Sequence, residues 1–588
     1  MKPAHFLSTL ASATLAALAV PASLQAAEPA VTVTLAPIAA PDHADAIGTV
    51  AVTLRFDGLT AAAGTPVLRL PLVASNVDTV ATVMTGFAAR DAAGPLTLTP
   101  RDVDLPEAGM RDAVGGGPSR EWLADRAITG PLTVRYSVPA EAALPPRGPA
   151  PPFSFSADGQ GVSAAGHMFL LLPPGEGRYR TTYAWDLTRA PKGSRGVSSL
   201  GEGRRTAAQP LDGAELRMSF FMAGRIGTWP AKVPAAGFFG AWQGSPCFDA
   251  SELLGWTGKL YGQYARFFAR KDAQPYGVFL RHNPINAGGG VGLHHAFVTT
   301  FGKNSCRDLG KIRLTLAHEM FHTFQPFIAE PGGLESSWFG EGLATFYQAR
   351  LPFRFGLLTP EQYIADVNWT AARYYTSAMA RVPNREVPKR FWADTRVRTL
   401  PYDRGMLYFA ALDDELRKAS GGKRSLDDLM KAMLAHEQTG ARNTNADWEA
   451  LLRQDLGEGA VQRFRGFLEG DIPVPASDAF GPCFRRIAKP LRRYELGFEP
   501  AVLAEPKRIV RGLIAGSAAA AAGLRDGDEI VDPVPQDAIQ GEQNESLNLR
   551  IRRGAEIFPL TYLPRGEVVD AWQWERNPSL GDGSCGSM

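Results

Sequence analysis

The chain has 588 residues, of which 45% are hydrophobic and 21% are charged, and its formal net charge is +2. This composition is that of an ordinary soluble globular protein, and the length allows three or four domains. The near balance of charges gives no electrostatic reason to expect a nucleic acid or an anionic membrane surface as a partner.

Residues 1–26 have the pattern of a secretory signal peptide. Lys2 precedes an apolar run from about Phe6 to Val20, and small residues follow up to Ala26. We expect cleavage near Ala26 or Ala27 and export to the periplasm or out of the cell. A membrane anchor is the alternative, but the run is short for a span, and no other run approaches the length of one. The mature chain is therefore expected to have no membrane span.

Residues 27–200 are predicted to form an all-β domain. Apolar residues recur with a period of two over Val31–Leu35, Val50–Phe56 and Leu132–Val138, as in strands with one buried face. Stretches rich in proline and glycine separate these runs. No catalytic pattern is visible in this region.

Residues 201–470 are predicted to form the catalytic domain. Its first half is expected to hold strands, a helix near Leu253 to Lys271 and a buried strand at Tyr276–Leu280. Helices dominate the second half. One of them opens with Thr359 before a proline, which is the order of a cap and a first helical position.

The sequence His-Glu-Met-Phe-His begins at His318. His318 and His322 lie on one helix face, so both can reach a single metal ion at about 2.0–2.1 Å. Glu319 is placed to take a proton from a water on that metal. Glu341, in a second helical pattern, is predicted as the third ligand, and Thr345 is a candidate for orienting it.

Two histidines, one glutamate and a water make a catalytic zinc site, with one Zn²⁺ per chain. The alternative is a buried helix whose two histidines are hydrogen-bonded within the core. These residues resemble the gluzincin metallopeptidases of the aminopeptidase N type. The stretches at 322–326 and 338–342 resemble the glycyl aminopeptidase family, whose members carry a PDZ domain.

The resemblance covers most of the mature chain, is strong at the two metal-binding helices and is weak in the first 200 residues. It implies a multidomain α+β protein. A thermolysin-like, mainly helical catalytic domain would stand between an N-terminal all-β domain and a C-terminal PDZ-like β domain.

The resemblance also implies that Gly292, His294 and His295 bind substrate. The family has Gly-Gly-Leu-Glu-His at this place, and in aminopeptidase N relatives the corresponding glutamate binds the free α-amine of the substrate. This chain has His294 there, and an imidazole does not pair with an ammonium as a carboxylate does. The preference for chain ends or internal bonds therefore stays open. The alternative reading of the two histidines is ordinary polar residues at a strand edge.

Tyr402 stands in Tyr-Asp-Arg-Gly, which resembles the Tyr-Glu/Asp-Lys-Gly motif of gluzincin aminopeptidases. There the tyrosine hydroxyl donates to the developing oxyanion, a role that suits a neutral phenol. The alternative is a core tyrosine that bonds a backbone carbonyl. Tyr374 and Tyr375 are the reserve candidates.

Residues 471–486 read as a linker and residues 487–575 resemble a PDZ domain. The resemblance implies that Leu496, Gly497 and Phe498 form a loop whose backbone N–H groups bind a peptide carboxylate. The alternative is a packing module of the same shape with a closed groove.

The four cysteines are Cys247, Cys306, Cys483 and Cys585. An exported protein meets an oxidising compartment, so two disulfides are expected among three possible pairings. Proximity in the sequence favours Cys247–Cys306 and Cys483–Cys585, and reduced buried thiols are the alternative. The last cysteine lies in a Gly/Ser-rich tail, 576–588, that is otherwise expected to be disordered.

These patterns predict an exported zinc metallopeptidase that hydrolyses peptide bonds, with an aminopeptidase-like activity as the first interpretation. An endopeptidase with altered recognition of the N-terminus is one alternative. A catalytically silent, chaperone-like protein that binds peptides through its PDZ domain is another. The expected partners are a peptide or protein substrate and a peptide C-terminus at the PDZ domain.

Overall fold

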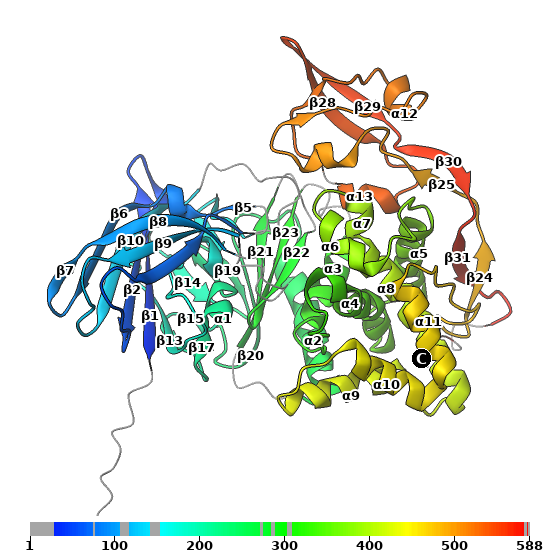
Figure 1. Ribbon diagram of the computed structural model, residues 1–588, viewed down its shortest axis with the longest axis horizontal. Coiled ribbons are helices and arrows are strands. Elements are labelled where there is room, and N and C mark those ends of the chain that lie inside the picture. The colour runs from blue at the N-terminus through cyan, green and yellow to red at the C-terminus, as the bar shows by residue number, and fades with distance from the viewer. Residues whose placement is uncertain are drawn as a thin grey trace, which may run out of the picture.

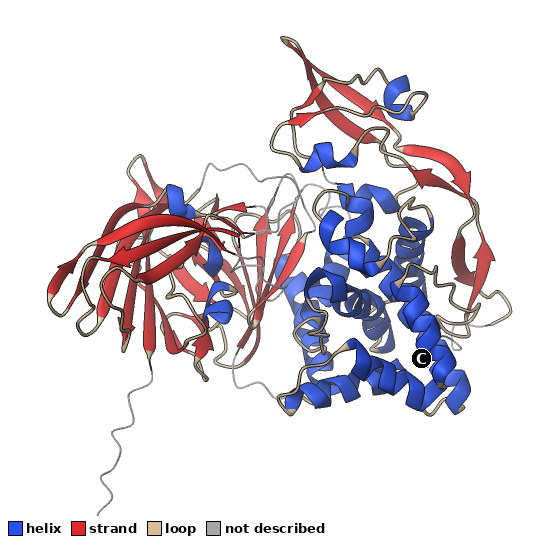
Figure 2. Cartoon of the chain, in the orientation of Figure 1, coloured by secondary structure: helices blue, strands red, loops and turns tan. Residues whose placement is uncertain are grey.

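The computed structural model describes residues 29–74, 77–105, 117–141, 153–270, 275–283, 289–302, 309–534, 536–580 and 585. A β-rich N-terminal region stands beside a helical region, and a small C-terminal module rises above the helices (Figures 1 and 2). The chain is therefore a multidomain α+β protein. The predicted signal peptide lies outside the described residues. Among the helices that are described, none has the length and apolar character needed to cross a bilayer.

Two sheets share the first core of the N-terminal region. The larger has the order β16-β13-β1-β2-β10-β6-β7, with β17 on β13, and the smaller has the order β3-β9-β8. Their strands are β1 Ala30–Ala40, β2 His43–Asp57, β3 Pro66–Pro71, β6 Thr85–Asp91, β7 Gly94–Leu96, β8 Leu98–Leu105, β9 Gly117–Ala124, β10 Leu132–Pro139, β13 Arg178–Trp185, β16 Arg205–Thr206 and β17 Leu211–Asp212. The three strands predicted from period-two alternation lie within β1, β2 and β10, which confirms them.

A third sheet, β11-β12-β18-β14-β15, packs into the same core. Its strands are β11 Ser156–Asp158, β12 Gly161–Ala165, β14 Arg195–Ser198, β15 Gly201–Glu202 and β18 Phe220–Gly224. The short helix α1, Gly213–Arg217, precedes β18. The predicted domain boundary at residue 200 falls between β14 and β15, which pair with each other.

The fourth sheet lies between the β-rich and helical regions and has the order β19-β20-β21-β23-β22. Its strands are β19 Gly227–Trp229, β20 Gly237–Trp242, β21 Pro275–His282, β22 Gly290–Leu293 and β23 Ala296–Phe301. Val278 faces the helical core and Phe279 faces the N-terminal core. Burial on both faces explains the continuous apolar run of β21 and confirms the predicted buried strand.

Helices fill the rest of the central region. They are α2 Ala250–Phe267, α3 Leu309–Phe321, α4 Ser337–Arg354, α5 Pro360–Tyr375, α6 Val387–Arg390, α7 Thr395–Arg398, α8 Leu400–Ser420, α9 Leu426–Gln438, α10 Asn445–Leu456 and α11 Glu458–Leu468. Thr359 caps α5 in a capping box, as predicted. Helices α4 and α8 approach most closely at Gly342, where an added Cβ would lie 2.7 Å from the Gly405 Cα. The buried Arg350–Asp413 ion pair, 2.6 Å long, joins the same two helices.

Two pairs of antiparallel strands connect the C-terminal module to the helical region, and these paired strands are called the ribbon below. Strand β24, Phe484–Ala488, pairs with β31, Trp572–Arg576, and β25, Leu491–Tyr494, pairs with β30, Arg565–Val569. Between them lie β26 Arg508–Ile509, α12 Ala518–Ala521, β27 Glu529–Ile530, α13 Gln536–Gly541, β28 Leu547–Arg553 and β29 Glu556–Tyr562. A separate hydrophobic cluster fills this module.

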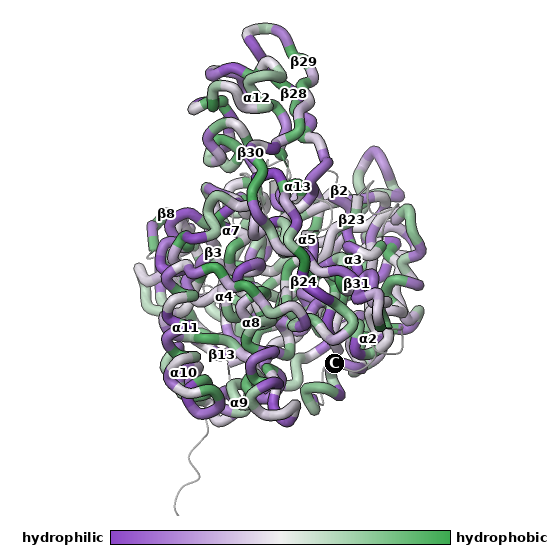
Figure 3. Tube along the Cα trace, turned by 90° about the vertical axis from the view of Figure 1, so that its right-hand side faces the viewer, coloured by the Kyte–Doolittle hydropathy of each residue, from purple (hydrophilic) through white to green (hydrophobic). Residues whose placement is uncertain are grey.

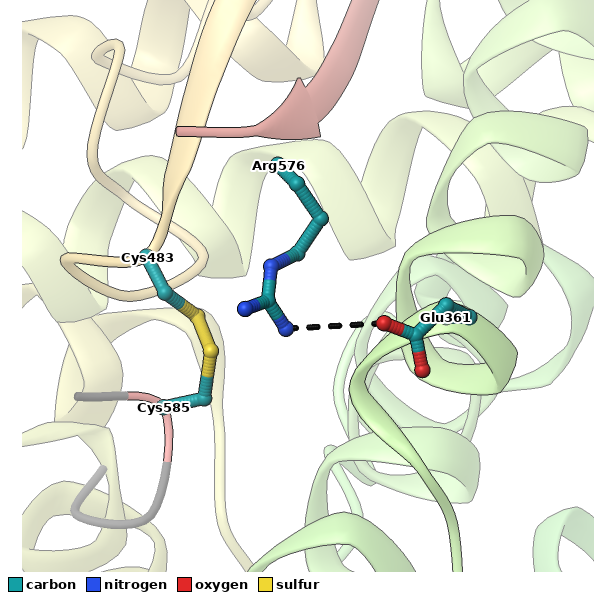
Figure 4. Close-up of a disulfide and its surroundings, with 4 residues drawn as sticks. All are labelled: Glu361, Cys483, Arg576 and Cys585. Carbon is teal, nitrogen blue, oxygen red and sulfur yellow. Dashed lines mark hydrogen bonds and ion pairs between the residues drawn. A yellow bond between two sulfur atoms is a disulfide. The ribbon is translucent and has the colours of Figure 1, made fainter. Parts of the chain in front are cut away.

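The ribbon is fastened to α5. Asn368 on α5 donates to the Trp574 carbonyl and accepts from its N–H, both at 2.7 Å, and Figure 3 shows β24 and β31 crossing the helical region there. The disulfide Cys483–Cys585 confirms one predicted pairing, and the ion pair between Arg576 and Glu361 lies nearby (Figure 4). Cys306 lies outside the described residues, so the Cys247–Cys306 pairing stays a prediction.

Candidate active site

Helices α3 and α4 bring two histidines and one glutamate to a single point. His318 Nε2 lies 3.2 Å from Glu341 Oε2 and 3.2 Å from His322 Nε2. His322 Nε2 lies 3.3 Å from the same carboxylate oxygen. Three ligand atoms at about 2.0–2.1 Å from a tetrahedral zinc ion stand about 3.3–3.4 Å apart. The three atoms therefore have the spacing of zinc ligands.

Glutamine side chains hold the far nitrogen of each ring. His318 Nδ1 lies 3.0 Å from Gln348 Oε1, and Gln348 Nε2 donates to both oxygens of Asp366 at 3.0 Å. His322 Nδ1 lies 2.7 Å from Gln325 Nε2, and Gln325 Oε1 has no hydrogen-bond partner among the described residues. The nitrogen and oxygen of the Gln325 amide have nearly the same shape, so the amide can be rotated by 180°. In that orientation Gln325 Oε1 accepts a hydrogen bond from the Nδ1–H of His322.

This arrangement sets the tautomer of both rings. A proton on each Nδ1 leaves the Nε2 lone pairs of His318 and His322 directed at Glu341. Metal-binding histidines characteristically donate their second N–H in this way. The residues present therefore fit a zinc ion, both in donor chemistry and in the support behind the ligands.

The charges of the site support the same reading. Burial opposes a charge on His322, but the Glu341 carboxylate outweighs it and raises the pKa of His322. Burial acts against ionisation of Glu341 as well, yet His322 and His318 hold the pKa of Glu341 well below its usual range. Glu341 is therefore an anion at neutral pH, as a metal ligand must be.

Glu319 lies on the side of α3 that faces the edge strand β22. A backbone hydrogen bond links the Gly292 N–H to the Glu319 carboxylate. A Cβ on Gly290 would lie 3.0 Å from both Glu319 Cγ and Thr315 Cγ2, so the glycine lets β22 approach α3 without displacing these side chains. Burial raises the pKa of Glu319 above its ordinary value, against the pull of the two histidines. A raised pKa suits a group that takes up and releases a proton.

Tyr402, in the first turn of α8, stacks on His318 with the ring centroids 5.8 Å apart. Burial, and then the Glu341 and Glu319 carboxylates, raise the pKa of Tyr402 well above its ordinary value. The phenol is therefore protonated at neutral pH and can donate. The reserve candidates point elsewhere, because Tyr374 donates to the Ala380 carbonyl and Tyr375 to that of Pro473.

Other predicted site residues lie apart from the histidine pair. His294 follows β22, and its Nδ1 is 3.8 Å from Glu215 Oε1 on α1. Its Nε2 is buried without a partner in the described part of the chain, and burial lowers the pKa of His294 to about 4. His295 adopts a positive φ of 47° in the turn that joins β22 to β23. Thr345 donates to the Glu341 backbone carbonyl at 2.8 Å.

The predicted peptide-binding loop lies in the C-terminal module. Leu496 and Phe498 are buried in its core, and Gly497 has a positive φ of 88°. The Leu496 carbonyl accepts from the Tyr562 hydroxyl at 2.7 Å. These residues are thus part of the module and not of the histidine site.

A cavity of about 560 Å³ opens beside His322. The end of α2, the segment after α3 and the end of α9 line it, with Arg270, Gln325 and Glu437 among the polar residues. It offers room for a ligand group next to the candidate metal ligands.

Neither a protein-family model nor a curated protein matches the chain. The aminopeptidase N family protein from Idiomarina loihiensis is similar over 93% of this chain and 98% of its own, with a TM-score of 0.63 and 14% identity. The M1 zinc metallopeptidase from Deinococcus radiodurans is similar over 76% and 96%, with a TM-score of 0.44 and 15% identity. Leukotriene A4 hydrolase from Saccharomyces cerevisiae is similar over 76% and 69%, with a TM-score of 0.44 and 12% identity. The first likeness shows that this chain has the fold of an aminopeptidase N family protein.

Proposed function

We propose that the chain is a zinc metallopeptidase in which His318, His322 and Glu341 hold one Zn²⁺. The observation that carries the proposal is the convergence of three ligand atoms at 3.2–3.3 Å, with Glu319 and Tyr402 beside them. The name of the aminopeptidase N family protein with which the chain shares its fold agrees with this activity. A protein that only bound peptides would not need a proton-transfer residue next to a complete ligand set, which disfavours the silent alternative.

Peptide hydrolysis needs an activated water and a stabilised oxyanion. The bound ion would supply a Lewis acid that acidifies water and polarises the peptide carbonyl. Glu319 takes the proton of the attacking water and passes it to the leaving nitrogen, which its raised pKa favours. Tyr402 donates its phenolic proton in a hydrogen bond to the developing oxyanion. Gln348 and Gln325 keep both imidazoles oriented.

The test combines metal analysis with the mapping of cleavage sites. The full mature chain should contain about one zinc per chain and should cut a peptide mixture at positions that mass spectrometry identifies. Glu319→Gln should keep zinc and lose hydrolysis, because an amide cannot accept the proton. Glu415→Gln, at a half-exposed position on α8, is the matched control and should keep full activity. Retained hydrolysis in Glu319→Gln would refute the mechanism.

We further propose that the enzyme lacks a fixed negative charge for the substrate N-terminus at position 294. The low pKa of His294 supports this, because it keeps the ring neutral at neutral pH. Matched peptides with free and acetylated N-termini should then be cleaved at similar rates, and His294→Glu should favour the free amine. His294→Gln is the uncharged control. A strict requirement for the free amine in the unmodified enzyme would show that another carboxylate anchors it.

The C-terminal module supports the finer assignment to the glycyl aminopeptidase family, with residues 487–575 as a PDZ-like domain after the 27–200 and 201–470 domains and the 471–486 linker. Gly497 fits a carboxylate-binding loop because its positive φ and tight packing on α12 exclude a side chain. Binding of a peptide with a free C-terminus, and not of its amidated form, is the result expected in a titration of the full chain.

Export is proposed from the signal-peptide pattern and supported by the Cys483–Cys585 disulfide. Protein recovered from outside the cytoplasm should begin near Ala27 or Glu28 and should show no free thiols after denaturation. Four free thiols, or an intact residue 1, would contradict this localisation.

A further inference from the structure

The short helix α13 of the C-terminal module is packed against the helices of the candidate active site. Figure 1 shows it directly above α6 and α7. Asp537 Oδ1 lies 2.5 Å from Arg398 Nη2 and accepts a hydrogen bond from Thr395. Gln540, one turn further on and only 1% exposed, donates to the Thr395 hydroxyl at 3.0 Å. The face of α13 that carries Asp537 and Gln540 therefore packs against α7.

The next residues extend the contact to two more helices. Glu542 accepts from Trp369 Nε1 on α5 at 3.1 Å and from Lys311 Nζ on α3 at 2.9 Å. A Cβ on Gly541 would lie 2.6 Å from the Trp369 Nε1, so the two surfaces are in close contact. The module therefore touches α3, which carries His318 and ends directly before His322, and α5, which carries Asp366.

The contact at α7 bears most directly on the chemistry. Helix α7 ends at Arg398 and α8 begins at Leu400, so Tyr402 stands one helical turn after Arg398. The Thr399 N–H donates to the Thr395 carbonyl, and the Asp403 N–H donates to the Thr399 carbonyl, which makes this corner a continuous hydrogen-bonded path. A shift of Arg398 would move the first turn of α8.

Arg398 depends on Asp537 for its charge balance. The Arg398 side chain is 9% exposed, whereas that of Asp537 is 47% exposed. Partial desolvation at the contact with α7 disfavours a charge on Asp537, but the Arg398 guanidinium outweighs it and lowers the pKa of Asp537. Removing the carboxylate would leave a largely buried cation, which must find water by moving.

We propose that Asp537 is a positioning residue of the active site, which holds the α7–α8 corner through Arg398 and thereby places the Tyr402 hydroxyl. The inference rests on the proposed peptidase activity and gives the C-terminal module a part in it. Asp537 acts through Arg398 and Tyr402. Removing its carboxylate should therefore lower turnover and leave substrate affinity and zinc content unchanged.

Asp537→Asn in the full chain is the test. We expect kcat to fall about 10-fold with KM within about twofold, since a displacement of about 1 Å can cost about 100-fold in rate. Asp537→Glu, which keeps the carboxylate, should recover most of the loss. Asp532→Asn is the control, because its pair with Arg550 lies on the surface of the same module, and it should leave kcat unchanged.

A second measurement separates positioning from general destabilisation. In a Tyr402→Phe background, Asp537→Asn should lower kcat by less than about twofold, because residues that act as one unit are not additive. The proposal would be overturned if the loss of kcat in the double variant equalled the product of the losses in the two single variants. An unchanged kcat in Asp537→Asn would also overturn it.

Hydrogen exchange gives a readout that does not require hydrolysis. Amides of residues 395–404 should exchange faster in Asp537→Asn than in the unmodified chain, and no faster in Asp532→Asn. Faster exchange in a chain that cuts no peptide would support the positioning contact while the proposed function failed. Unchanged exchange would refute the contact whatever the activity.

Discussion

Gly342→Ala tests how closely the helix of Glu341 must approach the helix of Tyr402. The added Cβ would meet the Gly405 Cα at 2.7 Å and Phe409 Cε2 at 3.0 Å, whereas ordinary contacts begin near 3.4 Å. Helices α4 and α8 would have to separate by several tenths of an ångström. Such overpacking costs roughly 1–3 kcal/mol of unfolding free energy.

The matched control is Gly262→Ala, on α2, where the added Cβ meets only the flexible Arg266 guanidinium at 4.0 Å. Both substitutions gain about 0.8–1.0 kcal/mol of helix propensity, so the difference between the two variants isolates the packing cost.

Thermal unfolding and peptide hydrolysis are measured on both variants. Gly342→Ala should melt at least about 2 °C below Gly262→Ala, given roughly 2–4 °C per kcal/mol for domains of this size. Its turnover should fall as well, because Glu341 is the preceding residue and Tyr402 lies on the helix that is displaced. Equal melting temperatures with unchanged turnover would refute the reasoning.

Three further outcomes are expected. Asp366→Ala should weaken zinc binding about 10–100-fold in competition with a chelator, because Gln348, behind His318, loses the carboxylate that accepts from its amide; unchanged affinity would count against that network. Burial lowers the pKa of His167 to about 4, from an ordinary value of about 6.5, so the unfolded chain binds more protons between these values. Stability should therefore fall as the pH drops from about 6.5 toward 4, and His167→Gln should flatten that part of a plot of melting temperature against pH; an equally steep plot would contradict the assignment. Asp413→Asn should cost roughly 3–5 kcal/mol in denaturant unfolding, because it leaves the buried Arg350 cation without its main partner; a cost below about 1 kcal/mol would show that the pair is not needed.

The helix that carries the candidate metal ligand His318 was predictable because its signal is local. Two histidines four residues apart meet on any helix, and Glu341 needs only a second helix packed on the first. The glutamines behind the ligands carry no such signal. Gln325 follows His322 by three residues, which is a weak hint, whereas Gln348 and its partner Asp366 depend on how α4 packs against α5.

The orientation of His294 is likewise a matter of tertiary structure. Its ring turns toward Glu215 because β22 ends there in a tight turn and α1, distant in sequence, packs alongside. The domain boundary near residue 200 shows the same limit. Period-two alternation predicts strands such as β1 and β2, but not that β14 and β15 form one sheet across that position. Pairing between segments distant in sequence has no local pattern.

The paired strands β24 and β31 bring the two ends of the C-terminal module together. Ala488 and Trp572 are paired between these strands, so their Cα atoms stand about 5 Å apart. A cassette whose ends are neighbours can be excised, or exchanged for another, without stretching the chain on either side. The Cys483–Cys585 bond lies outside the cassette and would close the remaining chain. Recombination at these paired strands would thus let one helical region acquire different outer modules next to the corner that carries Tyr402.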